Sequence, residues 1–205
     1  MQYLLRFCSM SLIIIMFLPA KRSWALSDRS FSLGIGYFSE NSIGKITSSP
    51  TGEPVGTFGT ISYPLILKYD WRWSSDYYFS PSLSYTLLKR KTAADSADVQ
   101  LWHLSLPIGQ NFSSSSFAWS LGPGILNRTI TGQGGSVTLN NGTGTAIFGL
   151  PARSSTTQVL TVNGGINYSS NSSTYGIDLT TEGILTAKRT LDIMISYSYS
   201  FSRGY

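Results

Sequence analysis

The sequence predicts an all-β chain that folds as an eight-stranded antiparallel up-and-down β-barrel and crosses a membrane. Three observations support this prediction. Large apolar side chains recur at every second position, the connections between the resulting strands alternate between short and long, and aromatic side chains gather beside the short connections. Alternation of apolar and polar residues is typical of a strand that has one apolar and one polar face.

The composition already narrows the class of protein. Of 205 residues, 12% are charged and 13% are aromatic, whereas about 25% of an average globular chain is charged. The aromatic content argues against a disordered chain. Without Arg6, Lys21 and Arg22, which precede the first expected strand, 12 basic and 10 acidic residues remain. This balance, with no basic stripe among the aromatics, predicts no nucleic-acid partner.

Residues 1–25 are predicted to be a secretory signal peptide that is removed after Ala25. Arg6 provides the positive charge of the N-terminal region, residues 11–18 form a short apolar run, and a small residue stands at the cleavage site. A membrane-spanning helix needs about 20 apolar residues, so this run is too short for one. An uncleaved anchor is the alternative, since two basic residues stand just before the site. We expect residues 26–205 to form the barrel domain.

The alternation is clearest at the C-terminal end of the chain. Leu191, Ile193, Ile195, Tyr197 and Tyr199 stand at every second position, separated mostly by small or polar residues. Strands of roughly ten residues are long enough to cross a bilayer when they are tilted. Eight strands are expected, at residues 31–37, 61–72, 77–86, 101–109, 117–125, 160–168, 175–182 and 191–202.

The connections distinguish this barrel from a soluble β-sandwich, which would show the same alternation. The links after the second, fourth and sixth strands are short and polar, at residues 74–76, 111–116 and 169–173. The links after the first, third and fifth strands are longer, at residues 39–56, 88–98 and 127–157, and only the last odd link, near residues 185–190, is short. Short turns at one end and long loops at the other are typical of outer-membrane barrels.

Aromatic residues lie within a few positions of the short turns or of the C-terminus. An up-and-down fold brings them to one level, where an interfacial girdle needs side chains with an apolar body and a polar edge. A sandwich core would not gather them at one end. The predicted girdle consists of Trp71, Trp73, Tyr77, Phe117, Trp119, Tyr168, Tyr175 and Phe201.

With these features the chain resembles the small eight-stranded bacterial outer-membrane β-barrel proteins, such as outer-membrane proteins A and X. The resemblance covers residues 29–205, and Tyr197, Tyr199, Phe201 and the terminal Tyr205 resemble the signal by which the family is recognised for assembly. Arg203 departs from that signal, in which an apolar residue is usual. The resemblance implies a location in the bacterial outer membrane, with its lipids and the barrel assembly machinery as partners.

The inward face is expected to be mostly Ser, Thr and Gly with a few charges. The predicted interior charges are Lys68, Asp70, Arg72, Asp178, Glu182 and Asp192. Opposite charges on neighbouring strands should pair, because an unpaired charge in a narrow lumen is costly. An eight-stranded barrel is just wide enough for its side chains to fill. We therefore expect a structural polar plug, with a low-conductance path for small molecules as the alternative.

One pair of residues, His103 and Ser105, could carry an enzymatic reaction. Their spacing resembles the His-x-Ser of outer-membrane lipid A deacylases, which need a general base, a hydroxyl nucleophile and an orienting carboxylate. Both are expected to face the lumen, and no acid is expected on the outward face nearby. We therefore expect a protein that is not an enzyme, with a lipid-modifying enzyme as the alternative.

The residue set offers little for a metal or a cofactor. The chain has one His, and its one Cys, Cys8, lies in the leader. Disulfides and cysteine-based metal sites are therefore excluded from the mature domain. No carboxylate cluster has metal-binding spacing, and no glycine loop is placed to hold a phosphate. We expect neither a metal nor a cofactor.

The longest loop, residues 127–157, is the candidate surface for function. Two strand-like runs flank Asn141-Gly142, which is a hairpin signal. The hairpin could extend the fifth and sixth strands above the membrane and bind an extracellular protein by strand addition. A solvated loop, or two further strands in a barrel of ten, are the alternatives. We expect a structural or surface-interaction role for these extracellular loops.

Overall fold

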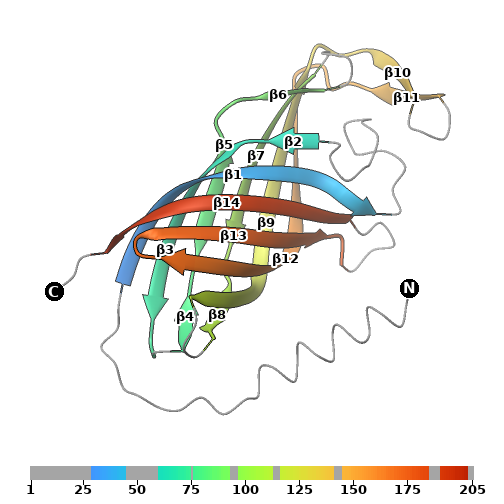
Figure 1. Ribbon diagram of the computed structural model, residues 1–205. Helices are drawn as coiled ribbons and strands as arrows, with labels where there is room; N and C mark the ends of the chain where they lie inside the picture. The colour runs from blue at the N-terminus through green and yellow to red at the C-terminus, as the bar shows by residue number, and fades with distance from the viewer. Residues whose placement is uncertain are drawn as a thin grey trace.

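The computed structural model describes residues 29–44, 60–74, 76–92, 97–112, 116–140, 145–184 and 190–202. The expected signal peptide and Tyr205 lie outside these described residues. All regular structure in this part of the chain is β-strand (Figure 1). None of the described residues form a helix long and apolar enough to span a membrane.

The strands follow one another along the chain with short breaks. They are β1 (Arg29–Gly44), β2 (Thr60–Ser62), β3 (Pro64–Arg72), β4 (Tyr77–Phe79), β5 (Ser82–Thr86), β6 (Arg90–Thr92), β7 (Ala97–Ser105), β8 (Ile108–Asn111), β9 (Phe117–Gly132), β10 (Ser136–Asn140), β11 (Thr145–Gly149), β12 (Ser154–Ser170), β13 (Ser173–Glu182) and β14 (Thr190–Ser202).

The strands form a closed antiparallel ring of eight spans. The spans are β1, β2 with β3, β4 to β6, β7 with β8, β9, β12, β13 and β14. The last span pairs with the first over most of their lengths, with Phe31 opposite Phe201. The predicted fold class is therefore confirmed. The hairpin of β10 and β11 forms a separate two-stranded sheet, so the alternative of ten strands is wrong.

The ring is apolar outside and polar inside. On β12, Leu160 and Ile166 are 72% and 57% exposed, whereas Thr161 and Asn163, on the opposite face, are 3% and 5% exposed. An outward apolar face of this extent is suited to lipid rather than to water. The alternation predicted for each strand is the alternation that the structure shows.

Several predicted strands are divided, and proline is the reason in two of them. The third divides at Pro81 and the fourth at Pro107, because proline has no N–H to donate to a ladder. The ladder continues across both breaks: Ser80 N donates to Pro107 O at 3.0 Å, and Leu106 N donates to Pro123 O at 2.9 Å. The ring therefore stays closed although its regular strands are interrupted.

The connections after the second, fourth and sixth spans are short and lie at one end of the barrel, which we call the turn end. Both β1 and β14 reach it, because Ser30 pairs with Ser202. An aromatic row crosses four neighbouring spans there: Phe117 lies 5.0 Å from Tyr168, Tyr168 lies 6.5 Å from Tyr175, and Tyr175 lies 5.3 Å from Tyr197, measured between ring centroids. Trp71, Trp73 and Phe201 are also exposed on the outward face, and Tyr77 and Trp119 are half-buried.

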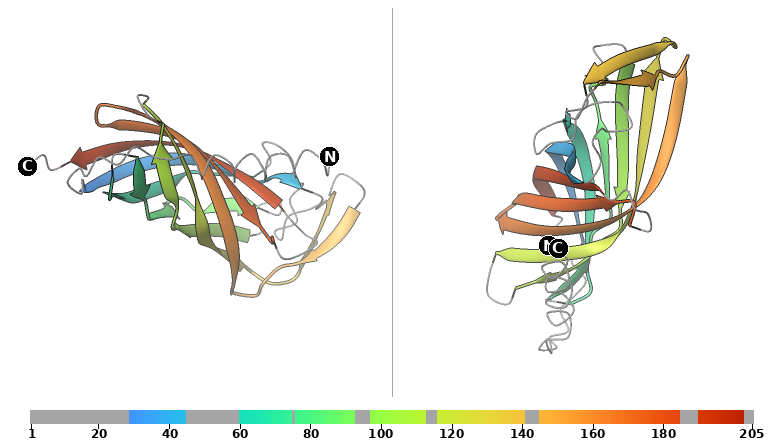
Figure 2. Two further views of the ribbon diagram at one scale, coloured as in Figure 1. Left: turned by 90° about the horizontal axis from the view of Figure 1, so that it is seen from below. Right: turned by 90° about the vertical axis from the view of Figure 1, so that its right-hand side faces the viewer.

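The opposite end, which we call the loop end, is uneven in height. Two strands expected to stop near the membrane continue beyond it: β9 extends to Gly132 and β12 begins at Ser154. Together with β6 and β7 they form a tall wall, and the β10–β11 hairpin lies at its far end (Figures 1 and 2). Most of the predicted 127–157 loop is therefore regular structure. The expected hairpin is present, with Asn140 opposite Thr145.

A single charge on the outward face tests whether that face lies in lipid. Ile177 is 55% exposed at the middle of β13. The variant Ile177→Arg should lower the free energy of unfolding in phospholipid vesicles by about 2–4 kcal/mol, because arginine is costly at the bilayer midplane. Ser173→Arg, at the turn end of the same strand, should cost about 0–1 kcal/mol. Equal costs for the two variants would contradict a membrane-embedded face.

Candidate functional site in the barrel lumen

A buried ion cluster joins opposite walls of the lumen near its loop end. Arg128 on β9 donates from Nε and Nη2 to Glu40 Oε1 on β1, at 2.8 and 2.6 Å. Its Nη2 also donates to Glu182 Oε1 on β13 at 3.0 Å. The side chains of Arg128 and Glu40 are 2% exposed, and that of Glu182 is 10% exposed. These three residues occupy the lumen at this level.

The described residues of the cluster carry more negative than positive charge. One guanidinium faces two carboxylates, and Asp192 on β14 is fully buried close by. Charge-assisted hydrogen bonds to one oxygen of each glutamate offset part of the desolvation cost of these buried ions. Removing Arg128 would deprive both glutamates of these hydrogen bonds. Arg128 therefore holds this section of the lumen together.

Arg128 and Glu40 are absent from the charges predicted for the interior, although they form its most buried ion pair. Sequence reasoning placed both in loops, because the apolar alternation of their strands fades after Tyr37 and Ile125. The period of two nevertheless continues. Arg128 is in phase with Gly124, and Glu40 is in phase with the inward residues of β1. Extending the inward register beyond the apolar run would have found both residues.

Apolar side chains also enter the lumen near its loop end. Phe38, Val99 and Leu101 form a buried cluster, against which Ile130 and Met194 pack. The sequence predicted an interior of Ser, Thr and Gly with a few charges, and this apolar cluster was not predicted. It lies next to the ion cluster, since Leu101 pairs with Arg128 across β7 and β9. The apolar cluster and the ion cluster together fill this part of the lumen.

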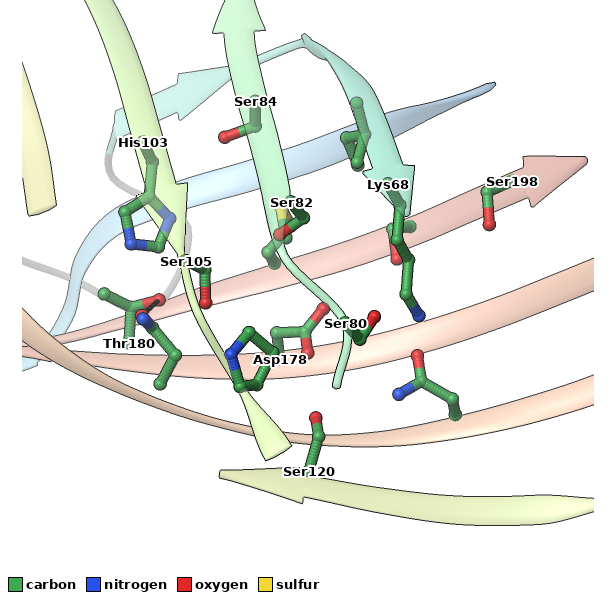
Figure 3. Close-up of a pocket in the computed structure, with 16 residues that line it drawn as sticks. Lys68, Ser80, Ser82, Ser84, His103, Ser105, Ser120, Asp178, Thr180 and Ser198 are labelled. Atoms are coloured by element: carbon green, nitrogen blue, oxygen red, sulfur yellow. Dashed lines mark hydrogen bonds between the residues drawn. The ribbon is translucent and has the colours of Figure 1, made fainter. Parts of the chain in front are cut away.

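A second charged group lies nearer the turn end. Lys68 Nζ is 3.7 Å from Asp70 Oδ1, and Ser80 Oγ donates to the same oxygen at 2.6 Å. Asp178, from the opposite wall, points into the same space as Lys68 (Figure 3). Arg72, at the end of β3, is exposed at the rim. The predicted interior charges are thus divided between two levels of the lumen and its rim.

The lumen between these two levels is narrow. A cavity of about 50 Å³ is lined by hydroxyl and amide side chains from most of the spans, with Lys68 and Asp178 at one side (Figure 3). A larger cavity of about 320 Å³ opens from it toward the turn end, and Lys68 and Asn167 line both cavities. Both cavities lie on the turn side of the Arg128 cluster.

His103 and Ser105 both point into the smaller cavity (Figure 3) and are 6% and 7% exposed. His103 Nε2 lies 3.2 Å from Thr161 Oγ1, and within the described residues no carboxylate is hydrogen-bonded to the ring. Without such a carboxylate the imidazole has no partner to orient it as a general base. The pair is also separated from the lipid-facing surface by the barrel wall.

Within the described part of the chain, no group of His, Cys, Asp or Glu residues could hold a metal ion. The three residues Tyr197, Tyr199 and Phe201 of the expected assembly signal are exposed on the outward face of β14. Tyr205, which completes that signal, lies outside the described residues.

The closed ring of eight antiparallel spans, its apolar exterior and its polar interior define a small transmembrane β-barrel of the outer-membrane type. Ail, the attachment invasion locus protein of Yersinia pestis, has the same fold. In a structure solved in complex with the heparin analogue sucrose octasulfate, Ail shares 12% identity with this chain at a TM-score of 0.50, covering 85% of this chain and 99% of Ail.

Two further solved barrels are similar at lower scores. The N-terminal β-barrel domain of Pseudomonas aeruginosa OprF has 7% identity and a TM-score of 0.45, over 85% of this chain and 99% of that domain. Neisserial surface protein A has 13% identity and a TM-score of 0.44, over 84% of this chain and 97% of that protein. No family model and no curated protein matches the sequence.

The contribution of the ion cluster can be measured by removing its cation. Arg128→Met should lower the free energy of unfolding in phospholipid vesicles by about 3–5 kcal/mol, because it removes the guanidinium that is hydrogen-bonded to the buried carboxylates of Glu40 and Glu182. Arg153→Met, at an exposed position before β12, should change it by less than about 0.5 kcal/mol. Adding Glu40→Gln and Glu182→Gln to Arg128→Met should recover part of the loss. A loss below 1 kcal/mol for Arg128→Met would contradict a structural role for the cluster.

Proposed function

We propose that this chain is a non-enzymatic protein of the bacterial outer membrane that binds an extracellular protein at its loop end. In this proposal residues 1–25 direct export and are cleaved, and the barrel assembly machinery inserts the chain among outer-membrane lipids. The observation that carries the proposal is an unpaired strand edge on β12, at residues 154–160.

This edge exists because β12 is longer than the strand beside it. From Ser154 to Leu160, β12 pairs with β9 on one side only. On its other side the pairing with β13 begins at Thr161, opposite Glu182. The described residues place no strand beside the upper part of β12. Within the described part of the chain, its backbone N–H and C=O groups on that side have no strand partner, and we infer that they can pair with another strand.

The side chains of the edge lack the features that usually prevent such pairing. Natural edge strands are protected by charged residues, prolines or bulges. The edge reads Ser154-Ser155-Thr156-Thr157-Gln158 followed by Val159 and Leu160, with no charge and no proline. All of these side chains except that of Val159 are exposed. An extended peptide could therefore add to β12 by backbone hydrogen bonding.

The lumen supports a binding role over transport or catalysis. The Arg128 cluster and the adjacent apolar cluster occupy it near the loop end. His103 and Ser105 point into a small cavity, and the hydrogen bond of the imidazole goes to Thr161. Among the described residues, the surface that remains for contact outside the cell is the tall wall with its hairpin. Ail, which has the same fold, is named for attachment and invasion.

Peptide binding to the edge tests the proposal. A fluorescent peptide with the sequence of residues 125–131, which pairs with β12 in the barrel itself, should bind the protein in lipid nanodiscs. Thr157→Lys should weaken binding by about fivefold, the equivalent of about 1 kcal/mol, because a charge disfavours pairing at an edge. Thr138→Lys, an equally exposed threonine in the hairpin, is the matched control and should leave binding unchanged.

A form of the same peptide that is N-methylated at every second residue should not bind, because the methylated backbone nitrogens have no N–H to donate to β12. If the peptide binds Thr157→Lys as well as it binds the unaltered chain, or if Thr138→Lys alone weakens binding, the β12 edge is not the docking site.

Conductance distinguishes a plugged barrel from a small channel. The unaltered protein should give no resolvable current steps in a planar bilayer. Arg128→Ala should give cation-selective steps, since it removes the side chain that joins the walls and leaves carboxylates that attract cations. Arg153→Ala should stay silent. Resolvable current steps of equal size from the unaltered protein and Arg128→Ala would instead favour the low-conductance channel.

A further inference from the structure

The turn end of the lumen is a polar cup. Its cavity of about 320 Å³ is lined by residues from all eight spans of the ring, so the barrel wall surrounds it completely. A water molecule occupies about 30 Å³ of liquid, so the cup has room for a small hydrated solute. The cup is blind, because the buried residues around Arg128 occupy the lumen beyond it.

The charges at the floor of the cup have partners of their own. Lys68 Nζ is 3.7 Å from Asp70 Oδ1, which also accepts a hydrogen bond from Ser80 at 2.6 Å. Asp178 points toward the same space from the opposite wall (Figure 3). The single lysine therefore lies between two carboxylates, and the floor carries no surplus of positive charge.

The rim of the cup, by contrast, is positive. Arg29 begins β1, Arg72 ends the neighbouring β3, and both line the cavity. Arg29 pairs with Trp71, so the two arginines lie close together at the same level. Both are exposed, and no carboxylate of the described residues lies within ion-pair distance of either. Two guanidinium groups at one rim offer up to ten N–H donors.

Uncharged hydrogen-bond donors lie deeper in the cup, below the two arginines of the rim. The amide of Asn167 lines its wall, and Asn171 lies in the turn between β12 and β13, whereas the hydroxyl of Tyr78 at the same wall donates to Trp119 O at 3.3 Å. Gly109 makes room for Tyr78, because a Cβ at that position would overlap the tyrosine ring. Oxygen atoms of a small anion would find charged donors at the rim and uncharged donors deeper inside, which suits phosphate better than an apolar solute.

We propose that this cup is a binding site for a phosphate-type oxyanion, held by Arg29 and Arg72 and entered from the turn end. The oxyanion belongs either to a free solute or to the headgroup of a phospholipid beside the barrel. Because the cup is closed beyond its floor, the site binds its ligand without passing it through the barrel. The site is separate from the β12 edge and does not depend on binding there.

The test uses the full precursor expressed in a diderm bacterium and the processed barrel purified from its outer membranes. Inorganic pyrophosphate is titrated into the protein in phosphatidylcholine nanodiscs while the NMR signals of the arginine side chains are followed. The signals of Arg29 and Arg72 should shift and saturate. Arg72→Gln and Arg29→Gln should each weaken binding by about tenfold or more, as expected for a lost charge-assisted hydrogen bond.

Arg153→Gln is the matched control, because it removes the same charge at an exposed position outside the cup. It should leave the pyrophosphate affinity unchanged. All variants should run as compact bands that slow after boiling, which shows that the barrel has folded. Failure of pyrophosphate to saturate either arginine signal, or equal affinities of Arg72→Gln and Arg153→Gln, would overturn the proposal.

Nanodiscs that contain phosphatidylglycerol identify the source of the oxyanion. If a headgroup occupies the cup, the signals of Arg29 and Arg72 should shift in these nanodiscs before any pyrophosphate is added, and the pyrophosphate affinity should fall. If the ligand is a free solute, the titration should be the same in both lipids. Either result supports the site and assigns its ligand.

Discussion

Backbone hydrogen bonding around the closed ring is the constraint on which the rest of the structure depends. A strand in lipid has no water to pair its N–H and C=O groups, so an open sheet cannot cross a membrane. The pairing of β1 with β14 removes both edges of the sheet. Where Pro81 and Pro107 interrupt the strands, carbonyl groups of prolines on neighbouring spans still accept N–H groups. Closure then fixes which side chains face lipid and which share the lumen.

Once the ring is closed, the lumen has to be filled. Eight spans enclose a space only wide enough for side chains. Near the loop end it is filled by a guanidinium between two glutamates and by the apolar cluster around Val99. Near the turn end it is filled less completely, because serine, threonine and asparagine leave a cavity there. The two ends of one lumen therefore differ, and the barrel has a closed end and an open one.

Much of the fold could be predicted from the sequence because strand faces in a membrane differ so strongly in polarity. Leu160 and Thr161 are neighbours in sequence, yet one is exposed and the other buried, as the period of two requires. Prediction was less complete where the chain leaves the lipid. There the outward residues no longer need to be apolar, so β9 and β12 continue with polar residues such as Thr129 and Thr156. The same loss of signal concealed Arg128 and Glu40, which long-range pairing brings together.

Because the wall is taller on one side, the strand edge that is free for binding is separate from the ladder of hydrogen bonds that closes the ring. Glu182 and Thr190 both lie at the level of Thr161, so β13 and β14 take no part in the upper section of β12. A strand added there would extend the wall sideways, beside β12, without displacing any hydrogen bond of the ring. Residues along Ser154–Leu160 can therefore change during evolution, or be replaced in the laboratory by other sequences, while the lipid-embedded ladder below keeps its register.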